Sequence, residues 1–457
     1  MVNKGKISYP VTKKTLHKYA KDIFGPIQRG ECVTTVWVPM AGRRMWNKFI
    51  IENIDLFKKE LSNHDKYLLV YIEPLDLTEE SMAGYLRLMG KSFIETCQKN
   101  PECKNKVGLK SSVKIFDDES SSYSKLLTTL RSLASKAGGY GFRVVFFMGE
   151  FDELGFANKI FFNNLKSLWS GLYPIVHYVF LMRERVVRTE KLTAWGEFNE
   201  AILQNIVYIP LRSEEDVSYL VQYFSREFAT SFSKKEVEVV KKLCGGHPYM
   251  IRVAFRVFKN QKTKTMKKEE LENLLYSYYE LQSVARGVFD VYDSKEKKIL
   301  GKIVRGEEVG KQDADHLEFL KKLRIVTGDK KYRLFGRLFE ETVRGSYKEE
   351  QTLEEVEAGL KLEKETDAIF LNGQTIEEKF SRQEYSVLKM FLEDTGKLKS
   401  RDDIGDILWG KESYEKYSDW AIDQLVCKLR KKLSALRVKD KLITVRRKGY
   451  KYIKPAP

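Results

Sequence analysis

The sequence predicts a multidomain protein in which an α/β domain with a mainly parallel sheet precedes mainly helical, α+β domains. Short apolar β-type runs alternate with helical patterns from about residue 33 to residue 258, which is typical of a parallel sheet covered by helices on both faces. From about residue 267 the strands almost vanish and helical periodicity takes over. A chain of 457 residues is also long enough for two to four domains of ordinary size.

The expected elements follow this order along the chain. Five sheet strands are predicted at VTTVWV (33–38), KYLLVYIEPLD (66–76), RVVFFMGE (143–150), IVHYVFLM (175–182) and NIVYIPL (205–211). The segment Asn100 to Ser122, rich in Lys, Ser and Asp, predicts a loop, and VTGDKKYRLF (326–335) predicts a hairpin. The predicted boundaries are an α/β domain at 1–200, a helical lid at 201–280, a winged-helix-like domain at 281–345, a linker at 346–362 and a C-terminal domain at 363–457.

Composition narrows the class of protein. Apolar and charged fractions of 42% and 32% are typical of a soluble globular chain, and no apolar run approaches the roughly 20 residues that span a bilayer. No signal peptide is expected at the polar, basic N-terminus. Five scattered cysteines without metal-ligand spacing argue against a disulfide framework or a zinc site, so a cytoplasmic protein without a membrane partner is predicted. The net charge of +17 favours an anionic partner.

The stretch MAGRRMWNKFII, residues 40–51, follows the first predicted strand, where a nucleotide-binding protein has its phosphate-binding loop. In the pattern G-x-x-x-x-G-K-[ST], backbone N–H groups and the lysine bind phosphate, and the hydroxyl ligates Mg²⁺. Gly42 and Lys48 keep this spacing, whereas Asn47 replaces the second glycine and Phe49 replaces the hydroxyl residue. On spacing alone, a chance match remains an alternative.

A second ATPase motif is expected at the end of a later strand, where an Asp holds Mg²⁺ and a Glu orients the attacking water. In RVVFFMGEFDEL, residues 143–154, Gly149 stands at the position of the Asp and Glu150 at that of the Glu. Both positions that would contact the metal, Phe49 and Gly149, therefore lack a ligand oxygen. The alternative is that Glu150 and its acidic neighbours begin a solvated helix, where they favour the positive end of the dipole.

The run LCGGHPYMIRVAF, residues 243–255, resembles the lid of AAA+/STAND-type ATPases, a group that includes archaeal replication initiators. GRRMWNKF and YIEPLDLTEESMAGYL are similar to other segments of that group, in the same order. The resemblance implies that Lys48 contacts phosphate and that Pro248 lines an adenine pocket, so ATP or ADP is expected to bind, if at all, without hydrolysis. The alternative is that Gly245 and Gly246 only end a helix. No catalytic residue and no metal site are assigned.

The C-terminal segment carries the most specific pattern. Ser381 and Glu384 predict a capping box at the first of two helices that are joined near Gly396. The next helix, about residues 419–433, has an apolar stripe, formed by Ile422, Val426, Leu429 and Leu433. Gln424, Lys428 and Lys431 fall opposite this stripe, and KLITVRRKGYKYI predicts a basic hairpin. Residues 428–454 hold twelve Lys or Arg and one acid, Asp440, which suits DNA, although a solvated amphipathic helix is the alternative.

The order of FSRQEYSVL, DILWG, AIDQLVCKLRKKL and ITVRRKGYKYI closely resembles the winged-helix DNA-binding domain of OmpR/PhoB-type response regulators. The resemblance implies that Gln424 reads a base and that Lys428, Lys431 and Lys432 contact the groove or phosphates, with Arg446, Arg447 and Lys448 in the wing. Two departures are evident: no phosphoacceptor receiver domain precedes this segment, and Gln424 with Leu425 is not typical of the family's base contacts.

Three functions are compatible with these patterns. The first is a transcriptional regulator that binds double-stranded DNA and uses a degenerate AAA+/STAND module as a pseudo-ATPase for homo-oligomerisation, sensing or partner binding. The second is a nucleotide-switched ATPase that acts on DNA in replication initiation or defence. The third is a non-catalytic scaffold whose winged helices bind protein.

Overall fold

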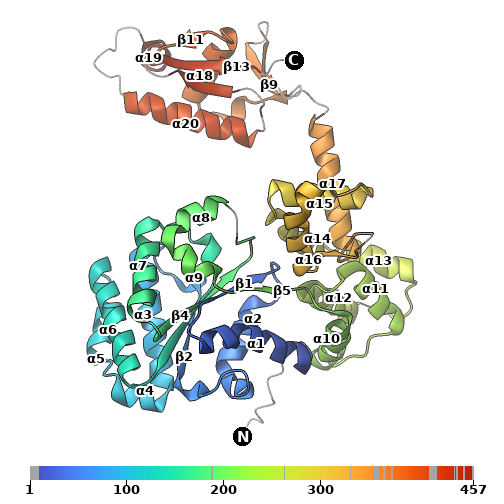
Figure 1. Ribbon diagram of the computed structural model, residues 1–457. Coiled ribbons are helices and arrows are strands. Elements are labelled where there is room, and N and C mark those ends of the chain that lie inside the picture. Colours follow the sequence, from blue (N-terminus) through green and yellow to red (C-terminus); the bar gives the residue numbers. More distant parts are fainter. Residues whose placement is uncertain are drawn as a thin grey trace. The chain divides into compact units, whose positions relative to one another are not determined.

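The computed structural model divides the chain into two compact units, residues 1–344 and 345–457, each described by itself (Figure 1). It describes residues 10–186, 189–261, 263–329, 331–354, 360–363, 367–371, 374–410, 419–436, 438, 441–445 and 448–454.

A five-stranded parallel sheet forms the centre of the first unit, in the order β2-β3-β4-β1-β5. Its strands are β1 (Val33–Trp37), β2 (Tyr67–Ile72), β3 (Arg143–Met148), β4 (Val176–Met182) and β5 (Ile206–Ile209). All five lie within the predicted runs. Central strands are buried because helices cover both faces of the sheet, and all seven residues of β4 are buried. The predicted α/β fold with a mainly parallel sheet is therefore confirmed.

Alternating side chains of the strands divide the core into two layers. Val145 and Phe147 of β3 pack in one cluster with residues of α1 and α2, whereas the intervening Phe146 contacts Phe93 of α3 and Tyr178 of β4. The helices of this domain are α1 (Lys13–Gln28), α2 (Arg43–Glu52), α3 (Met82–Lys99), α4 (Pro101–Lys106), α5 (Lys110–Asp117), α6 (Tyr123–Gly139), α7 (Lys159–Gly171), α8 (Thr189–Trp195) and α9 (Asn199–Leu203).

The prediction of a loop from Asn100 to Ser122 was wrong, because α4 and α5 lie there. Asn100 caps α4, with Pro101 in the first turn, and Phe116 of α5 is fully buried. The many exposed Lys, Ser and Asp side chains hid this short apolar face. Against the expectation of no disulfide framework, the same turn brings Cys97 of α3 and Cys103 of α4 together as a disulfide, with their Cα atoms 5.2 Å apart.

Two further groups of helices complete the first unit. One contains α10 (Glu214–Glu227), α11 (Lys234–Cys244), α12 (Pro248–Asn260) and α13 (Lys268–Tyr276), and shares one apolar cluster. The other contains α14 (Tyr279–Asp290), α15 (Ser294–Arg305), α16 (Ala314–Lys322), the hairpin of β6 (Val326–Thr327) and β7 (Arg333–Leu334), and the first half of α17 (Arg337–Glu354), which continues past residue 344. The predicted hairpin is therefore confirmed, and α17 extends across part of the segment where a linker was predicted.

In its described residues, the second unit combines two three-stranded sheets, β10-β9-β8 and β11-β13-β12, with three α-helices around one apolar core. Its elements are β8 (Leu360–Glu363), β9 (Ala368–Leu371), β10 (Gln374–Thr375), α18 (Arg382–Glu393), β11 (Leu398–Lys399), α19 (Arg401–Trp409), α20 (Asp419–Ala435), β12 (Lys441–Val445) and β13 (Gly449–Ile453). The capping box of Ser381 and Glu384 is present. The predicted apolar stripe is buried, with Ile422, Val426, Leu429 and Leu433 at most 3% exposed.

The two glycines of the GGHPY run allow the lid to approach its neighbours closely. Gly245 has a positive φ of 52°, and a Cβ there would collide with the carbonyl oxygen of Phe335, which follows β7. A Cβ on Gly246 would collide with the carbonyl oxygen of Arg212. These glycines therefore do more than end α11. Because they have no Cβ, they allow the lid to pack closely against two other segments.

We expect Gly245→Ala to destabilise the protein by about 3 kcal/mol or more, because it adds a backbone collision to an unfavourable φ. Gly108→Ala is the matched control, since Gly108 also has a positive φ, 68°, but no heavy atom lies within 4 Å of the added Cβ. It should cost about 1 to 2 kcal/mol. Urea unfolding followed by circular dichroism measures both, and equal losses would show that the close approach is unimportant.

Candidate ligand pocket and nucleic-acid interface

The loop that follows β1 places a basic helix start at the carboxyl edge of the sheet. Gly42 has a positive φ of 93° and is the N-cap of α2, so Arg43 is the first helical residue. Met40 also has a positive φ, 56°. In phosphate-binding loops the conserved lysine stands at the start of such a helix, next to the free N–H groups. Arg43, and not Lys48, has this position in the structure.

Carboxylates that follow β2 and β3 neutralise this helix start. Arg43 donates to Glu150 across 2.6 Å, and both side chains are at most 20% exposed. Arg44 pairs with Glu73 at 2.7 Å, which also accepts a hydrogen bond from Tyr71 at 2.8 Å. Burial and this carboxylate raise the pKa of Tyr71. The carboxylates that follow β2 and β3 therefore form ion pairs with the arginines that would otherwise bind a phosphate.

The other predicted residues of this loop have different environments. The Lys48 side chain is 73% exposed and its ion-pair partner is Glu52, at 3.9 Å, on the same helix. Phe49 is buried in the core between the sheet and α1, and Asn47 is only 1% exposed. Lys48 therefore points away from the start of α2, and the side chain after it stabilises the fold.

A small cavity of about 210 Å³ brings Gly42 and Pro248 together. The exposed Met40 lines it from the loop, the exposed Met45 from α2, and Tyr223 from α10. Neither Lys48 nor Glu150 is part of its wall. The cavity is smaller than the roughly 300 to 1,000 Å³ of typical small-molecule sites, although its apolar lining suits a flat ring.

Buried His247 fixes the lid to this loop. Its Nδ1 accepts the N–H of Met250 and so caps α12, which leaves the proton on Nε2, 2.9 Å from the carbonyl oxygen of Pro39. Burial, reinforced by the Arg212 charge, lowers the pKa of His247 to about 4. A neutral imidazole therefore joins the loop to the lid above pH 4.

The winged-helix-like segment before the second unit packs against the end of β5. Phe319 of α16 contacts the Tyr208 ring at 6.1 Å, and Lys322 lies 5.1 Å from the centre of the same ring. Leu211 donates to the carbonyl oxygen of Leu323 at 3.0 Å. The inner face of α16 is therefore used for packing within the chain. Lys331 and Arg333 are exposed in its hairpin, and Lys330 lies outside the described residues.

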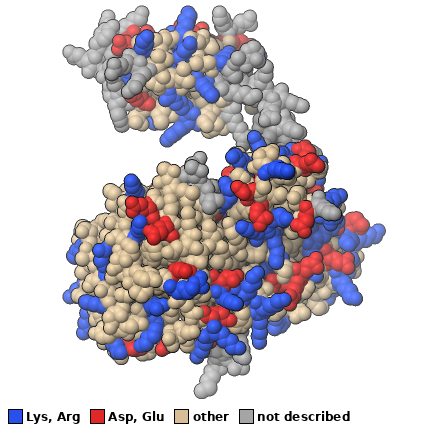
Figure 2. Space-filling view, in the orientation of Figure 1, with Lys and Arg blue, Asp and Glu red and all other residues tan. Residues whose placement is uncertain are grey.

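In the C-terminal unit, α20 presents polar side chains opposite its buried stripe. Gln424, Lys428 and Lys431 are exposed, and Figure 2 shows basic side chains on the face of the unit where α20 lies. Lys448 is exposed in the turn between β12 and β13, whereas Arg446 and Arg447 lie outside the described residues.

Lys432 differs from its neighbour Lys431. Its ammonium group is 2.6 Å from the carboxylate of Glu384, which is only 6% exposed, and lies 5.4 Å from the centre of the Phe380 ring. The Glu384 pKa is lowered: burial acts to raise it, but the hydrogen bonds from Lys432 and Ser381 outweigh burial. Lys432 thus joins α20 to the capping box of α18.

Sequence reasoning missed the contacts that hold the hairpin against α20. Arg430 donates to the carbonyl oxygen of Leu442 at 2.7 Å and to the hydroxyl of Thr444 at 2.8 Å. Asp423 accepts from Arg401 at 2.9 Å and from Tyr450, whose pKa rises to about 12 through burial and this carboxylate. In the sequence, Arg430 is one cation among twelve, so no local signal separates it from the exposed ones.

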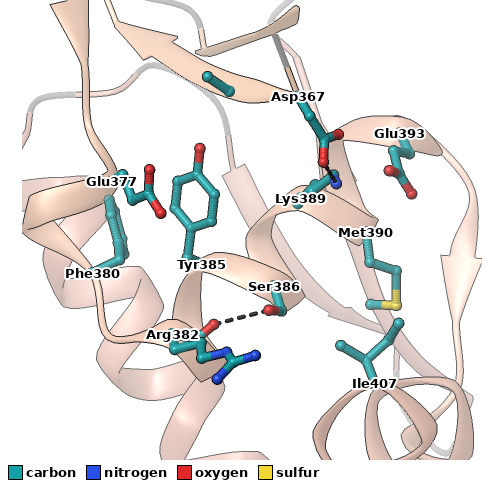
Figure 3. Close-up of a pocket in the computed structure, with 11 residues that line it drawn as sticks. Asp367, Glu377, Phe380, Arg382, Tyr385, Ser386, Lys389, Met390, Glu393 and Ile407 are labelled. Carbon is teal, nitrogen blue, oxygen red and sulfur yellow. Dashed lines mark hydrogen bonds and ion pairs between the residues drawn. The ribbon is translucent and has the colours of Figure 1, made fainter. Parts of the chain in front are cut away.

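The C-terminal unit has a cavity of its own, of about 740 Å³, which lies beside α18 (Figure 3). Tyr385, Lys389 and Met390 of α18 line it, together with Asp367 before β9 and Ile407 of α19. Lys389 pairs with Asp367 at 2.5 Å. Gln424, Lys428, Lys431, Lys432 and Lys448, the predicted DNA-contacting residues that the structure describes, do not line this cavity, so it is separate from the outer face of α20.

Comparison with protein families identifies the C-terminal domain. Residues 375–452 match the family described as the C-terminal domain of transcriptional regulatory proteins. The predicted winged-helix domain of OmpR/PhoB type is therefore confirmed, and this domain is non-enzymatic. No curated protein sequence matches the chain.

Solved structures resemble the chain at low identity. A Walker-type ATPase of Pyrococcus abyssi is 13% identical, with a TM-score of 0.47, over 72% of this chain and 95% of that one. The ORC2 protein of Aeropyrum pernix, in ADPNP–ADP complexes, is 11% identical, with a TM-score of 0.44, over 77% and 98%. The ORC1 protein of Aeropyrum pernix, in complex with DNA, is 11% identical, with a TM-score of 0.35, over 99% and 91%. Likeness at this level does not bear on activity.

No helix in the described part of the chain combines the length and apolar character needed to cross a membrane. Within the same residues, no group of three or more His, Cys, Asp or Glu side chains is arranged to hold a metal ion.

We expect Arg43→Ala to destabilise the protein by about 1 to 3 kcal/mol, because it leaves the half-buried Glu150 without this partner. Lys48→Ala removes the same kind of charge from the same helix, but from an exposed position, and should change stability by less than about 0.5 kcal/mol. Urea unfolding of the two variants gives the comparison. A larger loss in Lys48→Ala would contradict the placement of these two side chains.

Proposed function

We propose that the protein is a DNA-binding transcriptional regulator that contacts double-stranded DNA through the C-terminal unit. The observation that carries the proposal is the outer face of α20, where Gln424, Lys428 and Lys431 are exposed opposite a fully packed stripe. A helix with this arrangement fits the major groove, and a basic hairpin beside it fits the phosphate backbone. Arg446, Arg447 and Lys448 are proposed wing contacts, whereas Lys432 acts mainly by joining α20 to Glu384.

The α/β module is proposed to be a pseudo-ATPase. Arg43 stands where the phosphate-binding lysine would be, but it is paired with Glu150, and Arg44 is paired with Glu73. At the metal-binding position, a Cβ on Gly149 would lie 2.9 Å from the carbonyl oxygen of Ile72, so an Asp there would need the strands to move. Without protein ligands for Mg²⁺, a contribution of several kcal/mol to the transition state is lost.

The proposed role of the module is sensing, homo-oligomerisation or partner binding, and no cofactor is required for it. ATP or ADP is proposed as an optional ligand without hydrolysis, with its base in the cavity between Gly42 and Pro248. We also propose that this DNA-binding regulator is cytoplasmic. The boundaries at residues 200, 280 and 345 are retained as proposals for the α/β domain, the lid and the winged-helix-like domain.

One observation favours the alternative of a nucleotide-switched ATPase. The cavity between the loop and the lid is retained and is lined by Gly42 and Pro248, as the resemblance to AAA+/STAND-type ATPases implies. An ATPase would have to break the Arg43–Glu150 ion pair on binding nucleotide, which would expose both groups to the phosphates and Mg²⁺. Turnover measurements separate this alternative from the pseudo-ATPase.

We expect the purified protein to show no Mg²⁺-dependent ATP hydrolysis above that of Arg43→Ala, because neither residue at the positions that would hold Mg²⁺ has a side-chain oxygen. Phosphate release measured with saturating ATP and Mg²⁺ provides the test. A turnover near 1 s⁻¹ or above, within the ordinary enzyme range of about 1 to 10³ s⁻¹, that Arg43→Ala abolishes would establish an active ATPase instead.

We expect the full-length protein to bind duplex DNA with a strong salt dependence, losing on the order of 10³-fold in affinity between 50 and 200 mM salt if about six phosphates are contacted. Lys431→Ala should weaken binding to all sequences and reduce the salt slope by about 1 without changing stability. Gln424→Ala should mainly reduce the preference among sites, by about 1 to 3 kcal/mol.

Lys432→Ala is the matched control for Lys431→Ala, because the two residues are adjacent and carry the same charge. It should lower the free energy of unfolding by removing the partner of Glu384, and should affect the DNA salt slope less than Lys431→Ala does. Fluorescence anisotropy with labelled duplexes at several salt concentrations measures the slopes. Undetectable or salt-independent binding by the folded protein would favour the protein-interaction scaffold.

A further inference from the structure

A cavity of about 560 Å³ lies where three parts of the first unit meet, apart from the cavity between Gly42 and Pro248. Arg212 lines it from the segment between β5 and α10, Lys241 from α11, and Arg324, Thr327 and Phe335 from the winged-helix-like domain. Pro248 and the loop that follows β1 do not contribute to its wall. Its position makes it a contact point between the lid and the domain that follows.

Backbone hydrogen bonds hold the walls of this junction cavity in place. The N–H of Arg212 donates to the carbonyl oxygen of Gly246 at 2.9 Å, and that of Leu211 donates to Leu323 at 3.0 Å. The Arg324 guanidinium donates to the carbonyl oxygen of Leu211, also at 3.0 Å. The cavity is therefore a defined concavity and not a gap between loosely packed parts.

Positive charge dominates the wall of the junction cavity. Arg212, Lys241 and Arg324 supply three cations, and among the described residues that line it only Glu214 supplies a carboxylate. Arg212 is only 5% exposed, and its charge acts on the neighbouring His247. Like charges gathered around one concavity repel one another, and an anion bound between them relieves this repulsion.

The remaining groups of the wall indicate what kind of anion would fit. The Phe335 ring provides an apolar surface, whereas the hydroxyls of Ser213 and Thr327 donate to Asp216 and to the carbonyl oxygen of Arg333, which leaves the cations as the groups that would bind the anion. Arginine and lysine together bind phosphate oxygens well, because guanidinium groups donate two parallel hydrogen bonds and ammonium groups act as point charges. The volume lies within the roughly 300 to 1,000 Å³ of small-molecule sites.

We infer that the junction cavity binds a small phosphate-bearing anion, held by Arg212, Lys241 and Arg324. Because Lys241 belongs to the lid and Arg324 to the winged-helix-like domain, the bound anion links these two parts. The inference concerns a site separate from the DNA interface and from the start of α2, and it does not depend on the function proposed for either.

The test uses the full-length protein and inorganic pyrophosphate as the probe, titrated calorimetrically at low ionic strength without Mg²⁺. We expect binding at one site, weakened on the order of 10- to 100-fold by Lys241→Gln with Arg324→Gln, since each change removes a charge-assisted hydrogen bond. Lys241→Gln alone changes an exposed position and keeps the Arg324–Leu211 hydrogen bond. It should therefore give a smaller loss of pyrophosphate affinity. Thermal unfolding checks that each variant is folded.

The matched control is Lys234→Gln with Lys331→Gln, which removes the same total charge from exposed positions on α11 and on the hairpin, outside the cavity wall. It should change pyrophosphate affinity by less than about threefold, as expected for screened surface charges. Lys428→Ala with Lys431→Ala should also retain binding, which excludes the DNA-contacting face as the site. No binding by the unaltered protein, or equal losses in the cavity and control variants, would overturn the inference.

Discussion

The hydrogen bond from His247 to the carbonyl oxygen of Pro39, 2.9 Å long, is the contact on which the arrangement of the first unit depends. It joins the loop after β1 to the start of α12, and it requires a neutral, buried imidazole. Gly245 and Gly246 allow the chain to reach this position, because a Cβ on either would collide with neighbouring backbone. Residues of this lid segment line both the small cavity and the junction cavity.

The two units use their cations differently. At the start of α2, Arg43 and Arg44 are paired with Glu150 and Glu73, so the charge of the loop is compensated within the fold. On the outer face of α20, Lys428 and Lys431 remain exposed. A cation without a nearby carboxylate is available to an external anion, whereas a paired one must first lose its partner. This difference favours DNA binding, and not the hydrolysis of a nucleotide phosphate, as the main role of the basic residues.

The sheet strands, the capping box at Ser381 and the buried stripe of α20 could be predicted because each depends on local periodicity or on residues three apart. The residue at which α2 starts could not be predicted in this way. Counting from Gly42 pointed to Lys48, but the backbone turn makes Gly42 the N-cap, and Lys48 then points away. The α4–α5 segment was missed for a related reason: its few apolar residues are scattered among charged ones, and only packing shows that Phe116 is buried.

The sequence by itself determined the fold class and the C-terminal winged helix, because burial periods and capping residues are local properties that many neighbouring residues express together. It could not separate Lys431 from Lys432, or Arg430 from the exposed cations, because their partners are 12 to 48 residues away. The same holds for Arg212, Lys241 and Arg324, which meet around one cavity only after the lid has packed. Which charges are paired is a property of distance in space, and the tertiary structure alone decided it.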